Sequence, residues 1–235
     1  MRRATDNDQA QDMFQRAIDL DPTYAAAYAQ LGLSLVEAAV SGWTEFVHDD
    51  LDRAEKLGQK ALSLDPASAV AYRLLAEVDL QRRRFDLALG QNDRALEINP
   101  SDAETLAQRG NILTFADRVA ESLPWIEGAL RLDPANARAA LYLGQAYYFL
   151  GRYGEAVAAL DRAVAGNLGR NTQIDGRTEL AAAYAELDKP EDAARERTAV
   201  MQMSPFLDAA RFAGQYGSQH ARDRMLEGLK KAGFR

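Results

Sequence analysis

The stretch that decides the fold is Ala61-Leu62-Ser63-Leu64-Asp65-Pro66, because the chain repeats it at a fixed interval. Ala95-Leu96-Glu97-Ile98-Asn99-Pro100 and Ala129-Leu130-Arg131-Leu132-Asp133-Pro134 share its pattern, and the three prolines lie 34 residues apart. Less regular copies are Ala17-Ile18-Asp19-Leu20-Asp21-Pro22 and Val200-Met201-Gln202-Met203-Ser204-Pro205. A fixed interval of this length indicates a stack of similar helical units.

Each copy ends a helix, since proline disfavours helical backbone at the residue before it and cannot continue the helical hydrogen bonds. Small residues recur seven positions apart within these second helices, where two helices that cross closely have no room for larger side chains. They are Ala10, Ala54, Ala88, Ser122, Ala156 and Ala193, and then Ala17, Ala61, Ala95, Ala129 and Ala163. Leu-Gly or an equivalent pair marks the first helices, at Leu31-Gly32, Leu75-Ala76, Arg109-Gly110, Leu143-Gly144 and Leu180-Ala181.

These residues resemble the tetratricopeptide repeat family, although Asp79 and Arg109 fit its pattern less well. The resemblance implies an all-α, right-handed solenoid of helix pairs with a C-terminal capping helix. The expected divisions are a partial first repeat formed by a second helix only, five further repeats and the capping helices. Their ranges are 1–24, 25–68, 69–102, 103–136, 137–173, 174–205 and 206–235.

Three departures from the repeat are expected to alter it locally. About ten extra residues, near Ala39 to Asp49, lie between or lengthen one helix pair. The stretch from Ala165 to Asn171 lacks the terminating proline and predicts a looser turn. After Pro205 the register is lost, but Ser218 is a suitable N-cap for a closing helix with an apolar stripe at Ala221, Met225, Leu226 and Leu229.

Because the first repeat has no first helix, we expect the chain to be a segment of a longer protein.

Composition narrows the range of functions. The net charge of -7 argues against nucleic acid and anionic lipid as partners. There is no cysteine, no signal peptide and no apolar run of membrane-spanning length, so the expected location is the cytoplasm. The two histidines, His48 and His220, belong to no metal-binding motif. We therefore expect no catalytic residue, cofactor or metal, and interpret Arg82-Arg83-Arg84 as either a solvated turn or an anion contact.

The resemblance also implies a concave groove lined by first helices, in which a peptide or helix of a partner protein binds. The groove positions that it transfers to this chain are Arg73, Glu77, Gln108, Asn111, Phe115, Arg138, Tyr142, Gln145, Tyr148 and Phe149. Aromatic residues and arginine are typical anchors of protein interfaces. The alternative is that the rings pack on the neighbouring repeat. The clamp by which some family members hold carboxylate-ended peptides is disfavoured, because Glu77 and Tyr142 occupy positions where it needs asparagine and a base.

The whole chain is also similar to the C-terminal repeat regions of bacterial class III adenylate or guanylate cyclases. Similar regions follow bacterial winged-helix regulators. The leading expectation is a non-catalytic scaffold for protein–protein interaction, as the repeat region of a larger signalling protein. The alternatives are a regulatory segment of a cyclase or transcriptional regulator, and a structural solenoid that self-associates through the uncovered helix at residues 8–21.

Overall fold

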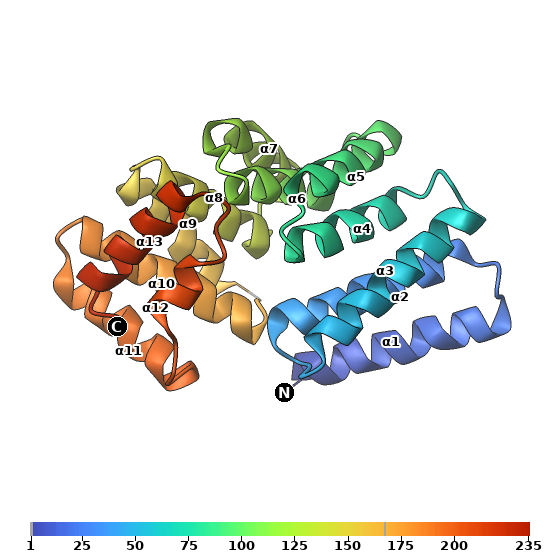
Figure 1. The fold of residues 1–235 in the computed structure, drawn as a ribbon, viewed down its shortest axis with the longest axis horizontal. Coiled ribbons are helices and arrows are strands. Elements are labelled where there is room, and N and C mark those ends of the chain that lie inside the picture. Colours follow the sequence, from blue (N-terminus) through green and yellow to red (C-terminus); the bar gives the residue numbers. More distant parts are fainter. Residues whose placement is uncertain (1, 167) are drawn as a thin grey trace. The chain divides into compact units, whose positions relative to one another are not determined.

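The computed structural model describes residues 2–166 and 168–235, and these residues form thirteen α-helices and no β-strand (Figure 1). The all-α architecture predicted from the repeat is therefore confirmed. Asn167, within the predicted loose turn, lies outside the described residues. The helices are α1 (Arg2–Leu20), α2 (Ala25–Ser41), α3 (Val47–Leu64), α4 (Ala69–Gln81), α5 (Phe85–Ile98), α6 (Ala103–Phe115), α7 (Val119–Leu132), α8 (Ala137–Phe149), α9 (Tyr153–Ala165), α10 (Arg170–Glu186), α11 (Pro190–Met203), α12 (Ala209–Ala213) and α13 (Gln219–Lys231).

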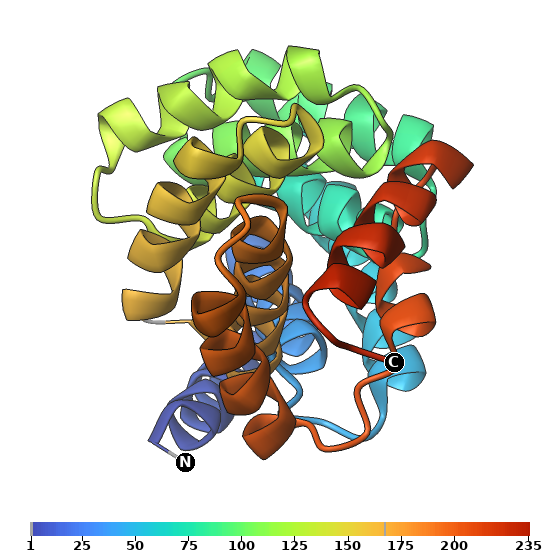
Figure 2. The ribbon, with the colours of Figure 1, turned by 90° about the vertical axis from the view of Figure 1, so that its left-hand side faces the viewer.

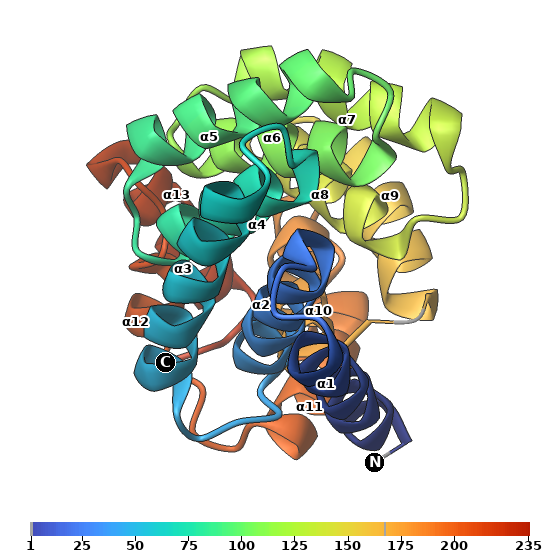
Figure 3. The same cartoon turned by 90° about the vertical axis from the view of Figure 1, so that its right-hand side faces the viewer.

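The helices group into two compact units, which are described separately. Unit 1 ends at Thr105 and contains α1 to α5, and unit 2 begins at Leu106 and continues to the C-terminus. In unit 1, α2 packs on α3 and α4 packs on α5, and the first helices α2 and α4 also touch each other (Figure 3). In unit 2, α8 pairs with α9 and α10 with α11, and α8 touches α10. Each unit is thus built from helix pairs whose first helices are neighbours.

Close approach of the paired helices depends on glycine and alanine. A methyl group at Gly144 would lie 2.5 Å from Cγ of Leu160, and one at Gly110 would lie 2.2 Å from Cγ1 of Ile126. The second-helix alanines are enclosed as the sequence predicts, since Ala95 is 1% exposed and both Ala129 and Ala163 are fully buried. Larger side chains at these positions would push the two helices of a pair apart.

The ends of the second helices follow the Asp-Pro and Asn-Pro signals. Asp65 caps α3 with an extended backbone, and its side chain accepts a 3.0 Å hydrogen bond from the N–H of Ala67. Asp133 does the same for α7, with a 3.1 Å bond from Ala135. The carboxylate thus replaces part of the hydrogen bonding that the helix loses at the proline.

The insertion lengthens one helix pair and its turn. Helix α2 has 17 residues where α4 has 13, and α3 has 18 residues where α5 has 14. The loop at residues 42–46 has five residues where the next turn, residues 82–84, has three. Gly42 closes α2 with φ 68°, a left-handed conformation that glycine adopts without strain.

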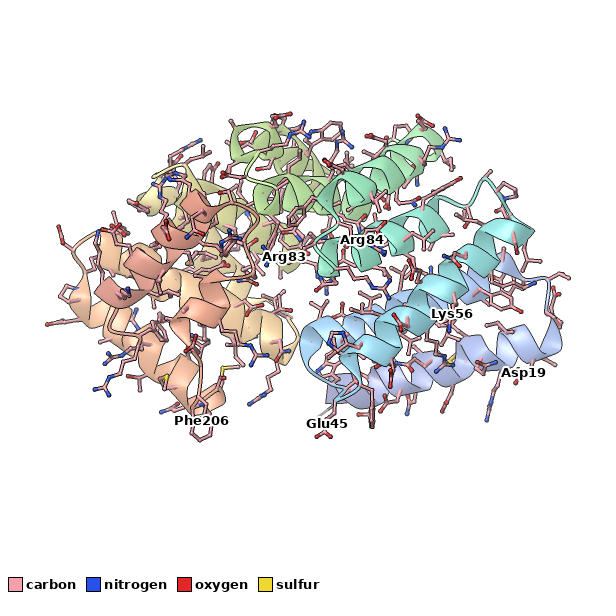
Figure 4. The ribbon with its side chains drawn as sticks, in the orientation of Figure 1. Asp19, Glu45, Lys56, Arg83, Arg84 and Phe206 are labelled. Atoms are coloured by element: carbon pink, nitrogen blue, oxygen red, sulfur yellow. The ribbon has the colours of Figure 1, made fainter. Side chains whose placement is uncertain are left out.

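In the basic run at residues 82–84, Arg82 and Arg84 form ion pairs with carboxylates of unit 1 and only Arg83 is exposed, which corrects the interpretation of the whole run as a solvated turn. Arg84 lies on the turn between α4 and α5 (Figure 4), 2.6 Å from Asp79 and 3.0 Å from Glu55. Arg82 bonds Glu55 at 2.6 Å and also pairs with Asp52. Burial raises the pKa of Asp79, and the charge of Arg84 opposes that rise. The network explains how a carboxylate occupies a first-helix position that is usually apolar.

An aromatic contact in unit 2 accounts for Arg109, the second residue that fits the repeat pattern less well. The guanidinium carbon of Arg109 lies 4.6 Å from the ring centroid of Trp125. Guanidinium groups stack favourably on indole faces, and their aliphatic stems cover apolar surface. The arginine therefore covers an aromatic side chain of α7 at this position.

Helix α13 closes unit 2. The side chain of Ser218 accepts a 3.0 Å hydrogen bond from the N–H of Ala221, which is the N-cap that the sequence predicts. Ala221, Met225 and Leu229 are at most 2% exposed, and α13 packs on α10 and α12. In Figure 2, α13 is the red helix near the C-terminus of the chain. The C-terminal segment, which we define as residues 208–235, is therefore an integral part of the core of unit 2.

Candidate functional site

The candidate site is built from polar residues that occupy one repeat position on the first helices of unit 2. Asn111 on α6, Gln145 on α8 and Glu179 on α10 are each 34 residues apart. All three are buried, with exposed fractions of 5%, 4% and 0%. Buried polar side chains need hydrogen-bonding partners to offset the loss of water, so their contacts decide what this surface can do.

Glu179 is the centre of this polar row. The amide nitrogen of Gln145 donates a 2.8 Å hydrogen bond to Oε1 of Glu179, and the hydroxyl of Tyr216 donates another, also 2.8 Å long, to the same oxygen. Three acceptor atoms remain without a hydrogen-bond partner among the described residues. They are Oε2 of Glu179, Oε1 of Gln145 and Oδ1 of Asn111.

Burial favours the neutral form of Glu179. Loss of water, together with the charge of Asp175 one helical turn away, raises the pKa of its carboxyl group to about 8. The hydrogen bonds from Tyr216 and Gln145 act in the opposite direction and are outweighed. Burial likewise raises the pKa of Asp175 to about 7, although this side chain keeps partial contact with solvent. The two carboxyl groups are therefore poised to change charge near neutral pH.

Aromatic rings pack beside the carboxyl group of Glu179. The ring of Tyr216 stacks on Phe115 with centroids 5.1 Å apart, and it meets Phe149 edge to face at 4.6 Å. The N–H of Gly217 donates a 2.9 Å hydrogen bond to the carbonyl of Phe115. Residues of the C-terminal segment thus contact both α6 and α8.

A second contact of the C-terminal segment buries Tyr148. The hydroxyl of Tyr148 donates a 3.3 Å hydrogen bond to the carbonyl of Arg224, whose guanidinium donates a 2.6 Å bond to the carbonyl of Phe149. A methyl group at Gly228 would lie 2.0 Å from the Tyr148 hydroxyl oxygen, so α13 approaches α8 closely. Burial raises the pKa of the Tyr148 hydroxyl far above its ordinary value, so it stays protonated.

The structure divides the ten predicted groove residues into four groups. Phe115, Tyr148 and Phe149 contact residues of the C-terminal segment, whereas the polar residues Gln108, Asn111 and Gln145 are buried on α6 and α8. Arg138 and Tyr142 on α8 remain partly exposed in unit 2. Arg73 and Glu77 lie on α4 in unit 1, where Arg73 Nε is 3.9 Å from a carboxylate oxygen of Asp102 and Glu77 accepts a 3.0 Å bond from Gln81. Contact of these ten residues with a partner stays a prediction.

Three residues of the site were missing from the sequence prediction. Glu179 is found by extending the 34-residue register by one repeat from Gln145, and Asp175 precedes it by one helical turn. Tyr216 follows Pro205, where the register is lost, so no spacing in the sequence relates it to Glu179. Its role emerges only from the packing of the C-terminal segment.

Neither a metal-binding cluster nor a membrane-spanning helix is found in the described part of the chain. Within it, no group of three or more His, Asp or Glu side chains is arranged to hold a metal ion. No helix in this part of the chain combines the length and the hydropathy that a membrane span requires. His48 and His220 are both exposed.

Solved structures with similar folds are tetratricopeptide repeat proteins and assemblies. The structure of the Cut9–Hcn1 hetero-tetramer of the APC/C has a TM-score of 0.71 at 19% identity, covering 96% of this chain and 40% of that one. TTC0263, a thermophilic repeat protein of Thermus thermophilus, has a TM-score of 0.58 at 19% identity, covering 85% and 99%. YrrB, described as a repeat protein with an unusual peptide-binding site, has a TM-score of 0.51 at 20% identity, covering 82% and 93%. At these identities the similarity establishes the fold.

The family assignment comes from the sequence itself. A comparison with curated proteins finds no match. The family described as tetratricopeptide repeat matches residues 41–103 and 108–169, which together make up more than half of the 235 residues. Both matched ranges include the Gly and Ala positions at which the helix pairs cross. The chain belongs to the tetratricopeptide repeat family.

Proposed function

We propose that this chain is a non-catalytic scaffold that binds a peptide or helix of another protein on the first-helix face of unit 2. The observation that carries the proposal is that Arg138 and Tyr142, one helical turn apart on α8, stay partly exposed. Tyr142 packs against the core of unit 2 and stays partly exposed, as an aromatic side chain at an interface does. Tyrosine and arginine are enriched among the residues that dominate binding energy in protein interfaces.

Membership of the repeat family supports this proposal, because stacked helix pairs provide an extended rigid surface. The peptide-binding site named for YrrB supports it too, as a precedent on a similar fold. Tyr148, which the sequence predicts as a groove residue, has a structural role in the proposal. Since it is fully buried and bonded to Arg224, we assign it to holding α13 against α8.

The test compares partner capture by the wild-type chain and by matched variants. We expect Arg138→Ala and Tyr142→Ala each to weaken the affinity for a partner purified with the wild-type chain by about tenfold or more. Leu132→Ala is the control, because Leu132 is 54% exposed at the end of the second helix α7. Circular dichroism verifies that the variants stay helical. Unchanged affinity in both groove variants would contradict the proposed surface.

A second candidate is self-association through α1. Met13 and Leu20 on this helix are 69% and 88% exposed, and they are the kind of apolar residue that helix–helix contacts between copies use. Sedimentation at several protein concentrations tests it. A concentration-dependent increase in mass that Met13→Glu and Leu20→Glu abolish would support self-association, whereas a monomer at all concentrations would exclude it.

A further inference from the structure

The first-helix face of unit 2 contains buried side-chain oxygens that lack a hydrogen-bond partner. Glu179 Oε2 and Gln145 Oε1 are buried atoms without a hydrogen-bond partner among the described residues, and both belong to side chains that already contact each other at 2.8 Å. An unpaired buried acceptor costs about 1–3 kcal/mol. Two of them at one contact indicate a place where a ligand with hydrogen-bond donors is accommodated.

The same place contains two ionisable carboxyl groups without a matching cation. Asp175 and Glu179 lie one helical turn apart on α10, so their carboxyl groups share a face of the helix. The described residues form no ion pair within 4.0 Å with either group. Elsewhere in unit 2, carboxylates such as Glu196 pair with arginine, here Arg177 at 2.7 Å. The Asp175–Glu179 pair therefore differs from other acidic groups of this unit.

Aromatic rings complete the surroundings of the carboxyl pair. Tyr216 bonds Glu179 through its hydroxyl, and its ring contacts Phe115 and Phe149. Ring faces attract cations, and guanidinium groups stack on them more readily than ammonium groups do. Carboxylates, an amide oxygen and rings together make an environment suited to a planar cation with several N–H donors.

We propose that Asp175, Glu179 and Gln145 recognise one arginine side chain of a protein partner. The guanidinium reaches the carboxyl pair at Asp175, because this is the member of the trio that stays partly exposed. As it binds, the proton held by the carboxyl pair is released to solvent. Its donors can satisfy the unpaired oxygens of Glu179 and Gln145 at the same time. The net charge of -7 favours encounter with a basic segment. This inference rests on the proposed scaffold function and adds the chemistry of the partner.

The test uses the full chain and two small probes. N-acetylarginine amide carries a guanidinium group and no other charge, and N-acetylcitrulline amide has a nearly identical shape without the charge. Carboxyl ¹³C NMR follows Asp175 and Glu179 as each probe is added. We expect saturable shifts of both carboxyl signals with the arginine probe, with a midpoint on the order of millimolar, and no saturable shift with the citrulline probe.

Variants identify the groups responsible for the shifts. Asp175→Asn and Glu179→Gln keep the size of each side chain and remove its charge, and each is expected to raise the midpoint about tenfold or more. Glu191→Gln is the control, because it removes one charge from an exposed position in the first turn of α11. The fluorescence of Trp125 verifies that unit 2 stays folded in each variant.

The outcomes separate this inference from the proposed function. Equal shifts with both probes, no saturable shift with the arginine probe, or binding unchanged in Asp175→Asn would overturn the arginine site. A partner whose affinity falls in Tyr142→Ala but is unaffected by Asp175→Asn would leave the scaffold function intact and still overturn the inference. A saturable response to the arginine probe, together with failure of the wild-type chain to capture any protein partner, would support the cation site and count against the scaffold function.

Discussion

The hydroxyl of Tyr216 donates a 2.8 Å hydrogen bond to Oε1 of Glu179, and both side chains are fully buried in unit 2. The two residues come from different structural layers, because Glu179 belongs to a first helix of the repeat and Tyr216 to the segment that follows the last repeat. The bond therefore ties the C-terminal segment to the repeat stack. It also places an ionisable group where its charge state affects stability.

We predict that removal of the Tyr216 hydroxyl destabilises unit 2. Tyr216→Phe keeps the ring between Phe115 and Phe149 but leaves Glu179 with one donor fewer, at a cost of about 1–2 kcal/mol. Urea unfolding measures the change by Trp125 fluorescence in a Trp43→Phe background, because each unit contains one of the two tryptophans. Equal unfolding midpoints and slopes for Tyr216→Phe and the parent would show that the bond is dispensable.

The raised pKa of Glu179 predicts that unit 2 becomes less stable as pH rises. The folded pKa of about 8 exceeds the ordinary value of 4.5, so the folded chain binds more protons than the unfolded chain between these values. The free energy of unfolding then falls with pH across this interval, by at most about 1.4 kcal/mol per pH unit for this group. Asp175, with a pKa of about 7, acts in the same direction from its ordinary value of 3.8 upward.

Substitution of Glu179 isolates this effect. Glu179→Gln removes the titration, so its free energy of unfolding should depend less steeply on pH from 5 to 8 than that of the parent. The same urea experiment at several pH values measures the slopes, with Glu191→Gln as control. If Glu179→Gln and the parent lose stability in parallel, the buried carboxyl group is not the cause.

Close helix crossing predicts opposite effects for two glycines of unit 2. Gly144→Ala places a methyl group 2.5 Å from Cγ of Leu160 and should destabilise unit 2 by about 1–3 kcal/mol. Gly128→Ala meets no atom nearer than 3.6 Å and should be neutral or stabilising by about 0.5–1 kcal/mol, since alanine favours helix. Thermal unfolding of both variants measures the contrast. Similar losses of stability in the two would contradict the packing described for α8 and α9.

The ion-pair network of unit 1 predicts non-additive effects. Arg84→Ala leaves Asp79 buried without its nearest cation and should lower the free energy of unfolding of unit 1 by about 2 kcal/mol. This is less than for a fully buried pair, because the arginine is partly exposed. Asp79→Leu restores the apolar residue that this repeat position favours, so the double variant should be more stable than Arg84→Ala alone. Trp43 fluorescence in a Trp125→Phe background measures both. Additive losses would show that the pair is not coupled.

Much of the fold can be predicted from the sequence because short local sequence signals specify each repeat. The Asp-Pro and Asn-Pro ends, the Leu-Gly pairs and the small residues at helix crossings each act over a few residues, and they recur at the same interval. Asp79 illustrates the limit, since its partner Arg84 lies on the turn after α4 and also pairs with Glu55 on α3, a contact that exists only in the folded unit. The N-cap at Ser218 can be predicted without such context, because a capping side chain bonds to a backbone N–H within the first turn of its own helix.

The candidate site is harder to predict for the same physical reason. The 34-residue interval relates Asn111, Gln145 and Glu179 to one another. It does not predict the positions of Tyr216 or Arg224, which follow the last repeat. Burial of Tyr148 and Phe149 depends on this C-terminal segment. Two of the predicted groove positions, Tyr148 and Phe149, are therefore covered by later residues of the same chain.

The most direct test of the central claim, that partners bind to the first-helix face of unit 2, is site-specific photo-crosslinking. A benzophenone amino acid replaces Tyr142 on α8 in one variant and Leu132 on α7 in another, and both side chains are accessible. We predict one protein crosslinked from position 142, lost in the presence of excess unmodified chain, and absent from position 132. Crosslinks from position 132 alone, or equally from both positions, would contradict this claim.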